Sequence, residues 1–361
     1  MIEKHYVRER GLSPAKTVDY LTDNYLDHGK LGTKSNNGGL YPVDRFDDPN
    51  ASRIIVLDIG AAAATPSVKS GQILEFSPDG RFRRILVPEQ SFPDGIVVDP
   101  PSADRRMFWT NMGRAGQKDG AVYSAKLDGS DIQTIVPHLN TPKQITMGRG
   151  KLYFTDREGG RIYRCSRDGS DLELLVSTST EVDKTDPSTA AERISDATKW
   201  CVGMAVSPEL GKFYWTQKGH PKSGEGRIFC ANIDATDSSP TARDIHCIYS
   251  DLPEPIDLEI HKSAAGEYTL YWTDRGEQPF GNSLNRIRLD PTSGLPAAGE
   301  KYEVLTRNLN EAIGLTKPDS ENDRIYMTDL GGSIYQCNLL GGKKETLFSA
   351  EYRAFTGIAF L

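Results

Sequence analysis

Four ionisable side chains lie at or beside a glycine position that recurs along the chain. Asp94 and Lys143 directly precede this position, Asp257 occupies it, and Glu311 lies three residues before it. Carboxyl and amino groups act as general acids or bases when a binding site holds a substrate beside them. We therefore predict Asp257, Glu311, Asp94 and Lys143 as the catalytic residues, with ordinary salt bridges as the competing interpretation for each.

The recurring position lies within short apolar segments. In chain order, its occupants are Gly95, Gln144, Gly203, Asp257, Gly314 and Gly357. Small residues suit a point at which several strands converge. We therefore expect the amide and the carboxyl that replace glycine to project into an axial channel, where a solvated, water-bridged role is the alternative to a functional one.

Other residues near these segments supply groups that can hold an organic molecule. Arg157 and Arg275 each directly follow a Thr-Asp pair, and a guanidinium there can bind a carboxylate or a phenolate. His220 lies in an inserted segment and can act near neutral pH. Apolar walls supply binding area while a few polar groups fix orientation. The predicted substrate-binding residues are Gln144, Trp200, Glu254, Arg157, Arg275, His220 and Phe355.

A repeated strand pattern must position all of these residues. A short apolar or aromatic segment ending in Thr-Asp or a variant of it recurs roughly every 45 to 60 residues, as the blades of a propeller do. Its six copies are at residues 55–58, 108–111, 153–156, 214–217, 271–274 and 326–329. An apolar strand precedes each of the last five copies, and a glycine-led strand with an aromatic residue follows each of them.

The spacing of the repeat predicts an all-β fold, a six-bladed β-propeller with four antiparallel strands per blade. Asp-Gly turns such as 127–130 and 167–170 join the third strand of a blade to an outer strand. The C-terminal segment 356–361 looks like an inner strand, which the first motif lacks. We therefore expect the C-terminal strand to close the ring, with residues 1–50 as an N-terminal arm or cover and residues 51–361 as the propeller.

Four insertions are predicted to lie on one face of this ring. Residues 177–199 lie between an outer and an inner strand, and residues 111–120, 217–226 and 275–284 lie between second and third strands. Both kinds of loop open on the same face, where binding residues collect because a rigid scaffold fixes the loop ends. Neutral drift of loop length is the competing explanation.

Bulk composition excludes several classes of partner. The formal net charge of -7 leaves no basic stripe to neutralise a nucleic-acid backbone. Residues 1–11 do not form a signal peptide, and no run is long enough to span a bilayer, so we expect a cytoplasmic protein without a membrane partner. The five cysteines include no Cys-x-x-Cys pair, which predicts reduced thiols and no zinc site.

The motif Tyr271-Trp272-Thr273-Asp274, with turns such as Leu127-Asp128-Gly129-Ser130, resembles the YWTD propeller of the low-density-lipoprotein receptor group over residues 54–361. This resemblance implies a structural role for the aromatic and Thr-Asp residues, among them Trp109, Trp215, Trp272, Asp156, Asp274 and Asp329. Six-bladed propellers similar to gluconolactonases and to strictosidine synthase act on small molecules at the axial funnel. The lactonases hold calcium or zinc with an early Glu, two Asn and an Asp, and the early Glu has no counterpart in this sequence.

We predict an intracellular enzyme that binds a hydrophobic organic substrate in the axial funnel. Its reaction would be a metal-independent cyclisation, a condensation, including cycloaddition, or an isomerisation, as in secondary metabolism, with no cofactor and no metal. Holding reactants in a reactive conformation lowers a barrier without a marked catalytic triad. Two alternatives stay open, namely a lactone or ester hydrolase of the gluconolactonase-like type and a protein-interaction propeller.

Overall fold

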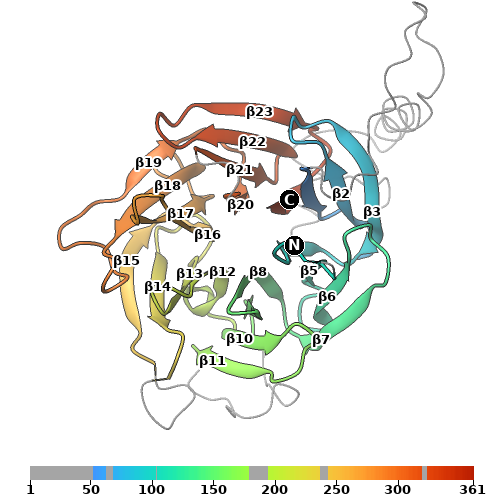
Figure 1. Cartoon of the computed structure of the whole chain (residues 1–361), viewed down its shortest axis with the longest axis horizontal. Coiled ribbons are helices and arrows are strands. Elements are labelled where there is room, and N and C mark those ends of the chain that lie inside the picture. Colours follow the sequence, from blue (N-terminus) through green and yellow to red (C-terminus); the bar gives the residue numbers. More distant parts are fainter. Residues whose placement is uncertain (1–51, 62–67, 103, 179–193, 236–242, 319–322) are drawn as a thin grey trace, which may run out of the picture.

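The described part of the chain is a ring of six β-sheets. The computed structural model describes residues 52–61, 68–102, 104–178, 194–235, 243–318 and 323–361, and the predicted arm at 1–50 lies outside these ranges. Every sheet has four strands and every pairing is antiparallel. Figure 1 shows the sheets as blades around a common axis. The prediction of a six-bladed β-propeller is confirmed.

Each blade runs outward from an inner strand near the axis. Blade 1 comprises β24 (Phe355–Phe360), β1 (Ile54–Asp58), β2 (Gly71–Phe76) and β3 (Phe82–Gln90). Blade 2 comprises β4 (Pro93–Val98), β5 (Arg106–Asn111), β6 (Gly120–Lys126) and β7 (Gln133–Leu139). Blade 3 comprises β8 (Pro142–Gly148), β9 (Lys151–Asp156), β10 (Arg161–Ser166) and β11 (Glu173–Ser177). Blade 4 comprises β12 (Cys201–Ser207), β13 (Lys212–Gln217), β14 (Gly226–Asn232) and β15 (His246–Leu252). Blade 5 comprises β16 (Pro255–Lys262), β17 (Tyr268–Asp274), β18 (Ser283–Leu289) and β19 (Glu303–Thr306). Blade 6 comprises β20 (Ala312–Thr316), β21 (Arg324–Asp329), β22 (Ser333–Asn338) and β23 (Lys344–Ser349). A short 3-10 helix, η3 (Ala197–Lys199), precedes β12.

The C-terminal strand closes the ring, as the sequence predicts. β24 pairs with β1, so the first blade combines the two ends of the described chain, and the end marked C in Figure 1 lies beside β2 and β20. Arg53 and Leu361 exchange two backbone hydrogen bonds of 3.0 and 2.8 Å. The Arg353 guanidinium adds an ion pair of 2.5 Å to Asp58. β24 therefore takes the inner position of blade 1, as one strand does in each of the other five blades.

The threonine of the repeated motif joins neighbouring blades. In blades 2 to 6 its hydroxyl donates to a backbone carbonyl at the start of the next inner strand, the pairs being Thr110 with Lys143, Thr155 with Val202, Thr216 with Ile256, Thr273 with Ile313, and Thr328 with Thr356. Blade 1 carries Leu57 instead, and there the Thr356 hydroxyl donates to the Pro93 carbonyl at 2.8 Å. One hydroxyl therefore fixes each seam between blades.

The aspartate and tryptophan of the motif are structural, as the resemblance implies. Asp156 accepts hydrogen bonds from the backbone N–H groups of Asn140 and Thr141, which lie in the link from blade 2. Asp274 and Asp329 accept similar bonds from Glu254 and Asn310. Three of the four tryptophans, Trp109, Trp215 and Trp272, lie in motif copies and are fully buried, whereas Trp200 lies outside the motif and is partly exposed.

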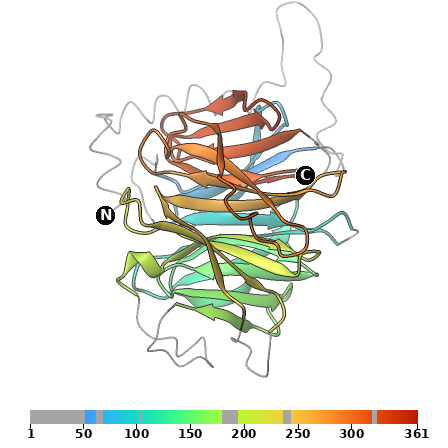
Figure 2. The same ribbon diagram turned by 90° about the vertical axis from the view of Figure 1, so that its left-hand side faces the viewer.

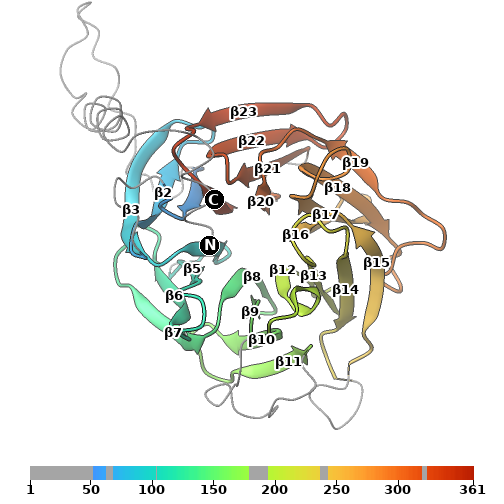
Figure 3. The same ribbon diagram turned by 180° about the vertical axis from the view of Figure 1, so that it is seen from behind.

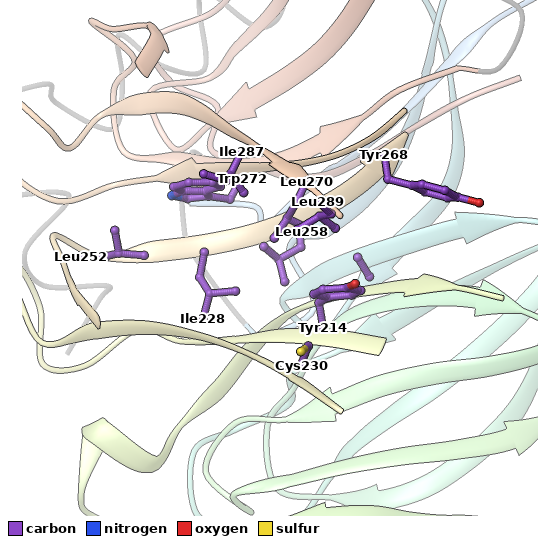
Figure 4. Packing of buried hydrophobic residues seen from close by; sticks show 11 residues of the cluster. Tyr214, Ile228, Cys230, Leu252, Leu258, Tyr268, Leu270, Trp272, Ile287 and Leu289 are labelled. Carbon is purple, nitrogen blue, oxygen red and sulfur yellow. The ribbon is translucent and has the colours of Figure 1, made fainter. Parts of the chain in front are cut away.

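The hydrophobic core lies between neighbouring blades. Figure 4 shows the cluster between blades 4 and 5, where Trp272, Leu258 and Ile228 pack together. Three third strands each carry a cysteine that is buried in such a cluster, namely Cys165 in β10, Cys230 in β14 and Cys337 in β22. Burial raises the pKa of these thiols, and all five cysteines of the chain are unpaired.

Candidate active site at the axial end

One end of the ring collects most of the predicted site residues. Inner strands begin at this end, second strands finish there and third strands start there, because neighbouring strands are antiparallel. The loops joining β5 to β6, β13 to β14 and β17 to β18 therefore open on this end, as the sequence predicts. Figure 2 shows the strands from the side. The fourth predicted insertion, 177–199, falls largely outside the described residues.

A repeated backbone contact builds the rim of this end. The residue that follows the second-strand motif donates its N–H to the carbonyl of the residue just before the inner-strand start, at 3.0 to 3.1 Å. The pairs are Ile59 with Ala354, Met112 with Phe92, Arg157 with Thr141, Arg275 with Glu254, and Leu330 with Glu311. Lys218 follows the motif in blade 4. The six post-motif residues thus occupy equivalent places.

These equivalent places carry two kinds of chemistry. Consecutive blades 3, 4 and 5 carry Arg157, Lys218 and Arg275, which we call the cationic arc. Blades 6, 1 and 2 carry Leu330, Ile59 and Met112 instead. The sequence prediction included the two arginines, whereas Lys218 was missed although it follows the motif in the same way.

The carboxylate of Glu254 holds two members of the cationic arc together. It is fully buried and accepts from the Lys218 amino group at 2.9 Å and from the Arg275 Nε at 2.8 Å. The backbone N–H of Lys222 donates to its other oxygen at 3.1 Å. Burial lowers the pKa of Lys218 to about 8, even though Glu254 opposes that shift. Two cations therefore share one buried anion.

Trp200 packs against the remaining cation. The Arg157 guanidinium lies 4.9 Å from the centroid of its ring, and the Lys218 amino group lies 5.6 Å from it. The indole N–H donates to the Ile194 carbonyl at 2.7 Å. Cations over an aromatic face are attracted by its quadrupole. Trp200 thus packs against two members of the cationic arc.

A buried ion pair lies beside the arc. The Lys143 amino group contacts Asp94 Oδ1 at 2.5 Å, and Gln144 donates to Asp94 Oδ2 at 3.3 Å. All three side chains are almost wholly buried. Burial lowers the pKa of Lys143, and the positive charges of Arg157 and Arg275 add to this effect, whereas Asp94 raises it. The predicted residues Asp94, Lys143 and Gln144 are therefore brought together, close to the cationic arc.

Asp257 occupies a different environment from the one expected. Its carboxylate accepts the backbone N–H of Leu258 at 2.9 Å and, across the seam to blade 6, that of Leu315 at 3.1 Å. A Cβ at the equivalent Gly203 would lie 2.0 Å from the Ile256 carbonyl. The position therefore faces the next inner strand, and Asp257 lies in the seam instead of projecting freely along the axis. Burial raises its pKa to about 8.

Glu311 lies at the outer side of the charged groups. It is about a third exposed, and its carboxylate is 3.9 Å from the Arg275 guanidinium and 3.8 Å from the Lys222 amino group. Lys222 makes a closer ion pair of 2.9 Å with Glu277. The backbone of Glu311 has a φ of 59°, which a non-glycine residue seldom adopts.

Two predicted binding residues are not brought into this group. Phe355 is fully buried in the core between blades 1 and 6, where it packs near Phe76 and Phe348. Its aromatic side chain therefore fills the core and does not line the axis. His220 is exposed on its loop, and its imidazole contacts Glu225 of the same loop at 2.6 Å.

An apolar patch at the axis was missed by sequence reasoning. It contains six buried residues from blades 1, 4, 5 and 6, namely Ile59, Val202, Ile256, Ile313, Leu330 and Ala354. Residues of four blades contact one another only where the blades converge, so this patch lies at the axis. The sequence did contain a sign of this patch. Val202, Ile256 and Ile313 directly precede the recurring glycine position in blades 4, 5 and 6, just as Asp94 and Lys143 do in blades 2 and 3.

Across the ranges that the structure describes, no group of three or more His, Cys, Asp or Glu side chains is arranged to hold a metal ion. In the same ranges, no helix combines the length and the apolar character that crossing a membrane requires.

Two known proteins resemble this chain over most of its length. No established sequence-family profile matches it. It is 46% identical over 372 residues to the 3-hydroxyacyl-CoA dehydrogenase-like protein LAM1 of Cochliobolus heterostrophus, covering 99% of this chain and 75% of that protein. It is 40% identical over 320 residues to the low-density lipoprotein receptor-related protein 1 of Pyricularia oryzae, covering 86% of this chain and 98% of that protein.

Solved structures place the fold in a wider class. A chain in the crystal structure of a nidogen/laminin complex aligns with a TM-score of 0.61 at 17% identity, covering 86% of this chain and 98% of that one. A putative 6-phosphogluconolactonase from Bacteroides uniformis aligns with a TM-score of 0.50 at 12% identity, covering 86% of this chain and 99% of that one. The protein is a six-bladed β-propeller of the YWTD type. Within that class, it belongs to the family represented by the Cochliobolus and Pyricularia relatives.

Proposed function

We propose that this propeller is a small-molecule enzyme that binds a hydrophobic organic substrate at the axial end. The reaction would be a metal-independent cyclisation, a condensation, including cycloaddition, or an isomerisation, in secondary metabolism and in the cytoplasm. One observation carries the proposal. The buried groups Asp94, Lys143 and Asp257 lie at the starts of the inner strands β4, β8 and β16, and the apolar patch is formed in part by the starts of β12, β16 and β20 at the same axial end. Apolar walls with a few fixed polar groups are typical of small-molecule sites.

The buried groups have protonation behaviour suited to proton transfer. Asp257, with a pKa raised to about 8, keeps its proton at neutral pH and can donate it. Lys143, with a lowered pKa, releases its proton more readily than an exposed lysine and has Asp94 2.5 Å away to stabilise the charged form. Environments that shift the pKa values of neighbouring groups in opposite directions support the assignment of one group as an acid and the other as a base.

Ligand binding and turnover test the proposal. Purified protein is titrated with small aromatic and terpenoid ligands, and substrates that bind saturably are then followed for product. Asp257→Asn and Glu311→Gln should lower turnover by at least about tenfold, the lower part of the range for a general acid or base. Asp104→Asn, on an exposed residue in the link from β4 to β5 at the opposite end of the ring, is the matched control. Absence of saturable binding, or unchanged turnover in both site variants, overturns the proposal.

Two alternatives have their own discriminating results. A lactone or ester hydrolase is favoured by the fold shared with the Bacteroides protein, and turnover that is lost on chelation and restored by a divalent cation would support it. A protein-interaction propeller is favoured by the fold shared with a chain of the nidogen/laminin complex. That reading predicts binding of a folded partner across the axial face and no turnover of organic substrates.

The name of the Cochliobolus relative suggests a further activity, hydride transfer with a nicotinamide cofactor. Dinucleotides bind at the carboxyl ends of a doubly wound parallel sheet. Every strand pairing in the described residues is antiparallel. We therefore do not transfer a dehydrogenase activity from that relative to this chain, and our proposal includes no hydride transfer.

A further inference from the structure

The cationic arc holds more positive than negative charge at its centre. Lys143 is matched by Asp94 and Arg157 by Glu158, at 2.5 and 2.8 Å. Lys218 and Arg275, in contrast, share the single carboxylate of Glu254. Glu311 approaches Arg275 only to 3.9 Å and is about a third exposed, so water weakens its effect. At the centre of the arc, Lys218 and Arg275 thus form their close ion pairs with one and the same buried carboxylate.

Arg157 has hydrogen-bonding capacity left for a ligand. One of its terminal nitrogens donates to Glu158, while its Nε is buried and has no hydrogen-bond partner among the residues that the structure describes. Its guanidinium lies over Trp200, and this contact holds the planar group in a fixed orientation without neutralising it. A buried donor without a partner is costly in a folded protein. A ligand oxygen would relieve that cost.

Apolar side chains take the same rim position on the other side of the axis. Leu330 and Ile59 belong to the apolar patch, and Phe92 packs against it. Met112 is partly exposed, and its sulfur lies 3.2 Å from the Lys143 amino group, where the apolar and charged sides meet. Figure 3 shows the ring from behind, with the inner strands that carry both sides converging on one axis. A molecule bound across the axis would contact both sides.

We propose that the axial end binds an organic acid, with its carboxylate against the cationic arc and its apolar body against the apolar patch. This inference rests on the proposed function, because it concerns the same site, and it specifies the substrate class. The carboxylate accepts from the Arg157 guanidinium and lies within the field of Lys218 and Arg275. A neutral molecule with the same apolar body loses these charge-assisted hydrogen bonds. The arc therefore sets a preference for acids.

Matched probes test this preference directly. Octanoate and octan-1-ol share an apolar chain and differ in the head group, and their dissociation constants are measured by calorimetry and by the total tryptophan fluorescence, to which Trp200 contributes. Wild-type protein should bind octanoate at least about tenfold more tightly, in keeping with a hydrogen bond to a charged group. Added salt should weaken octanoate binding and leave octan-1-ol binding unchanged or slightly stronger.

Two arginine variants separate the arc from the general charge of this face. Arg157→Gln should reduce the preference for octanoate about tenfold while leaving octan-1-ol binding in place. Arg114→Gln is the control, because Arg114 lies in another second-to-third-strand loop of the same end and is paired with Asp119 at 2.8 Å. It should leave the preference unchanged. Thermal melting checks that both variants fold. If Arg157→Gln does not fold, the salt titration of wild-type protein still tests the inference.

Each outcome separates the two proposals. Equal binding of both probes, independent of salt, overturns the acid preference and leaves a hydrophobic small-molecule site. Equal loss of preference in both arginine variants overturns the role of the arc and assigns the effect to the overall charge of this face. Failure of both probes, and of the aromatic and terpenoid ligands, to bind overturns the proposed function itself.

Discussion

The cationic arc and the apolar patch share one backbone frame and carry opposite chemistry. Arg157 and Ile59 make the same backbone hydrogen bond in different blades, each 3.0 Å long to the residue before the inner strand. The frame is fixed by the threonine and aspartate contacts that every seam repeats in some form. Side chains at the post-motif position can therefore differ between blades without disturbing the ring. Repetition supplies the scaffold, and departures from it supply the site.

The two regions differ in how their stability arises. The apolar patch gains stability from burial, in rough proportion to the area removed from water. The cationic arc keeps buried charges, which are stable only while each is paired and hydrogen-bonded. A change that removes one partner should therefore cost far more in the arc than a change of similar size in the patch. The predictions below test this difference, together with the ring closure and seams that both regions need.

The largest effect should come from opening the ring on the apolar side. Deleting residues 355–361 removes β24, whose Phe355 and Ile358 are buried and whose partner β1 is wholly buried. An exposed inner edge and an open core should abolish cooperative unfolding, as followed by circular dichroism on heating. Deletion of Leu361 alone keeps β24 and removes the two backbone hydrogen bonds with Arg53, so this control should still melt in one sharp transition. A truncated protein that still melts in one sharp transition contradicts the closure.

Removing the shared anion should have the next largest effect. Glu254→Ala leaves Lys218 and Arg275 without their buried partner, which should lower the free energy of unfolding by about 3–5 kcal/mol. Ile256→Val, in the apolar patch, should lower it by only about 0.5–1.5 kcal/mol. Chemical denaturation measures both.

A surface ion pair calibrates the comparison. Glu303 is paired with Arg286 and is mostly exposed, so Glu303→Ala should cost less than about 1 kcal/mol. Similar losses for Glu254→Ala and Glu303→Ala would show that Glu254 is not the anchor of the arc.

A smaller effect is expected at the seam where blades 5 and 6 meet. The Thr273 hydroxyl donates to the Ile313 carbonyl at 2.5 Å and accepts from the Asp257 N–H at 3.1 Å. Thr273→Val leaves both groups without this partner, which should lower the free energy of unfolding by about 1–3 kcal/mol. Thr134→Val, on an exposed part of β7, is the matched control and should be nearly neutral. Equal stabilities of the two variants would contradict the seam role.

The sequence predicted the scaffold well because the scaffold repeats. Six motif copies indicated six blades, and each copy ends where a second strand ends, as at Asp156 and Asp274. The absence of an inner strand before the first motif, together with an extra one at the end, predicted the closure by β24. These features are local in sequence, and each is supported by its counterparts in other blades.

The candidate site was harder to predict because it consists of departures from the repeat. Asp257 was expected to project along the axis, but its carboxylate accepts the Leu315 N–H in the seam. The sequence gives no sign of that partner, which lies in another blade. Phe355 stands near the axis in sequence register, yet its alternating side-chain direction places it in the core. Lys218 and the apolar patch become apparent only when equivalent positions of all six blades are compared.

The smallest expected effect is the pH dependence of the free energy of unfolding. Two titrating groups contribute to it, namely Asp257, which borders the apolar patch, and Lys218, which belongs to the cationic arc. The pKa of Asp257 is raised from 3.8 to about 8 by burial, so between these values the folded protein holds a proton that the unfolded chain has lost. The free energy of unfolding should therefore fall as pH rises from about 4 to about 8. The pKa of Lys218 is lowered from 10.5 to about 8, so the folded protein loses its proton first. This group should make the free energy of unfolding rise between about pH 8 and pH 10.5.

Variants assign the two limbs of this pH profile. Asp257→Asn should reduce the fall in stability below pH 8, and Lys218→Met should reduce the rise above it, when each is compared with wild-type protein by urea unfolding at a series of pH values. Other buried groups with shifted pKa values, such as Asp274, supply the rest of the slope. Asp104→Asn controls for loss of an exposed carboxyl group. If Asp257→Asn leaves the lower limb unchanged, Asp257 is ionised in the folded state and cannot donate a proton at neutral pH. If Lys218→Met leaves the upper limb unchanged, Lys218 keeps its full charge there, and the shared carboxylate of Glu254 outweighs its burial.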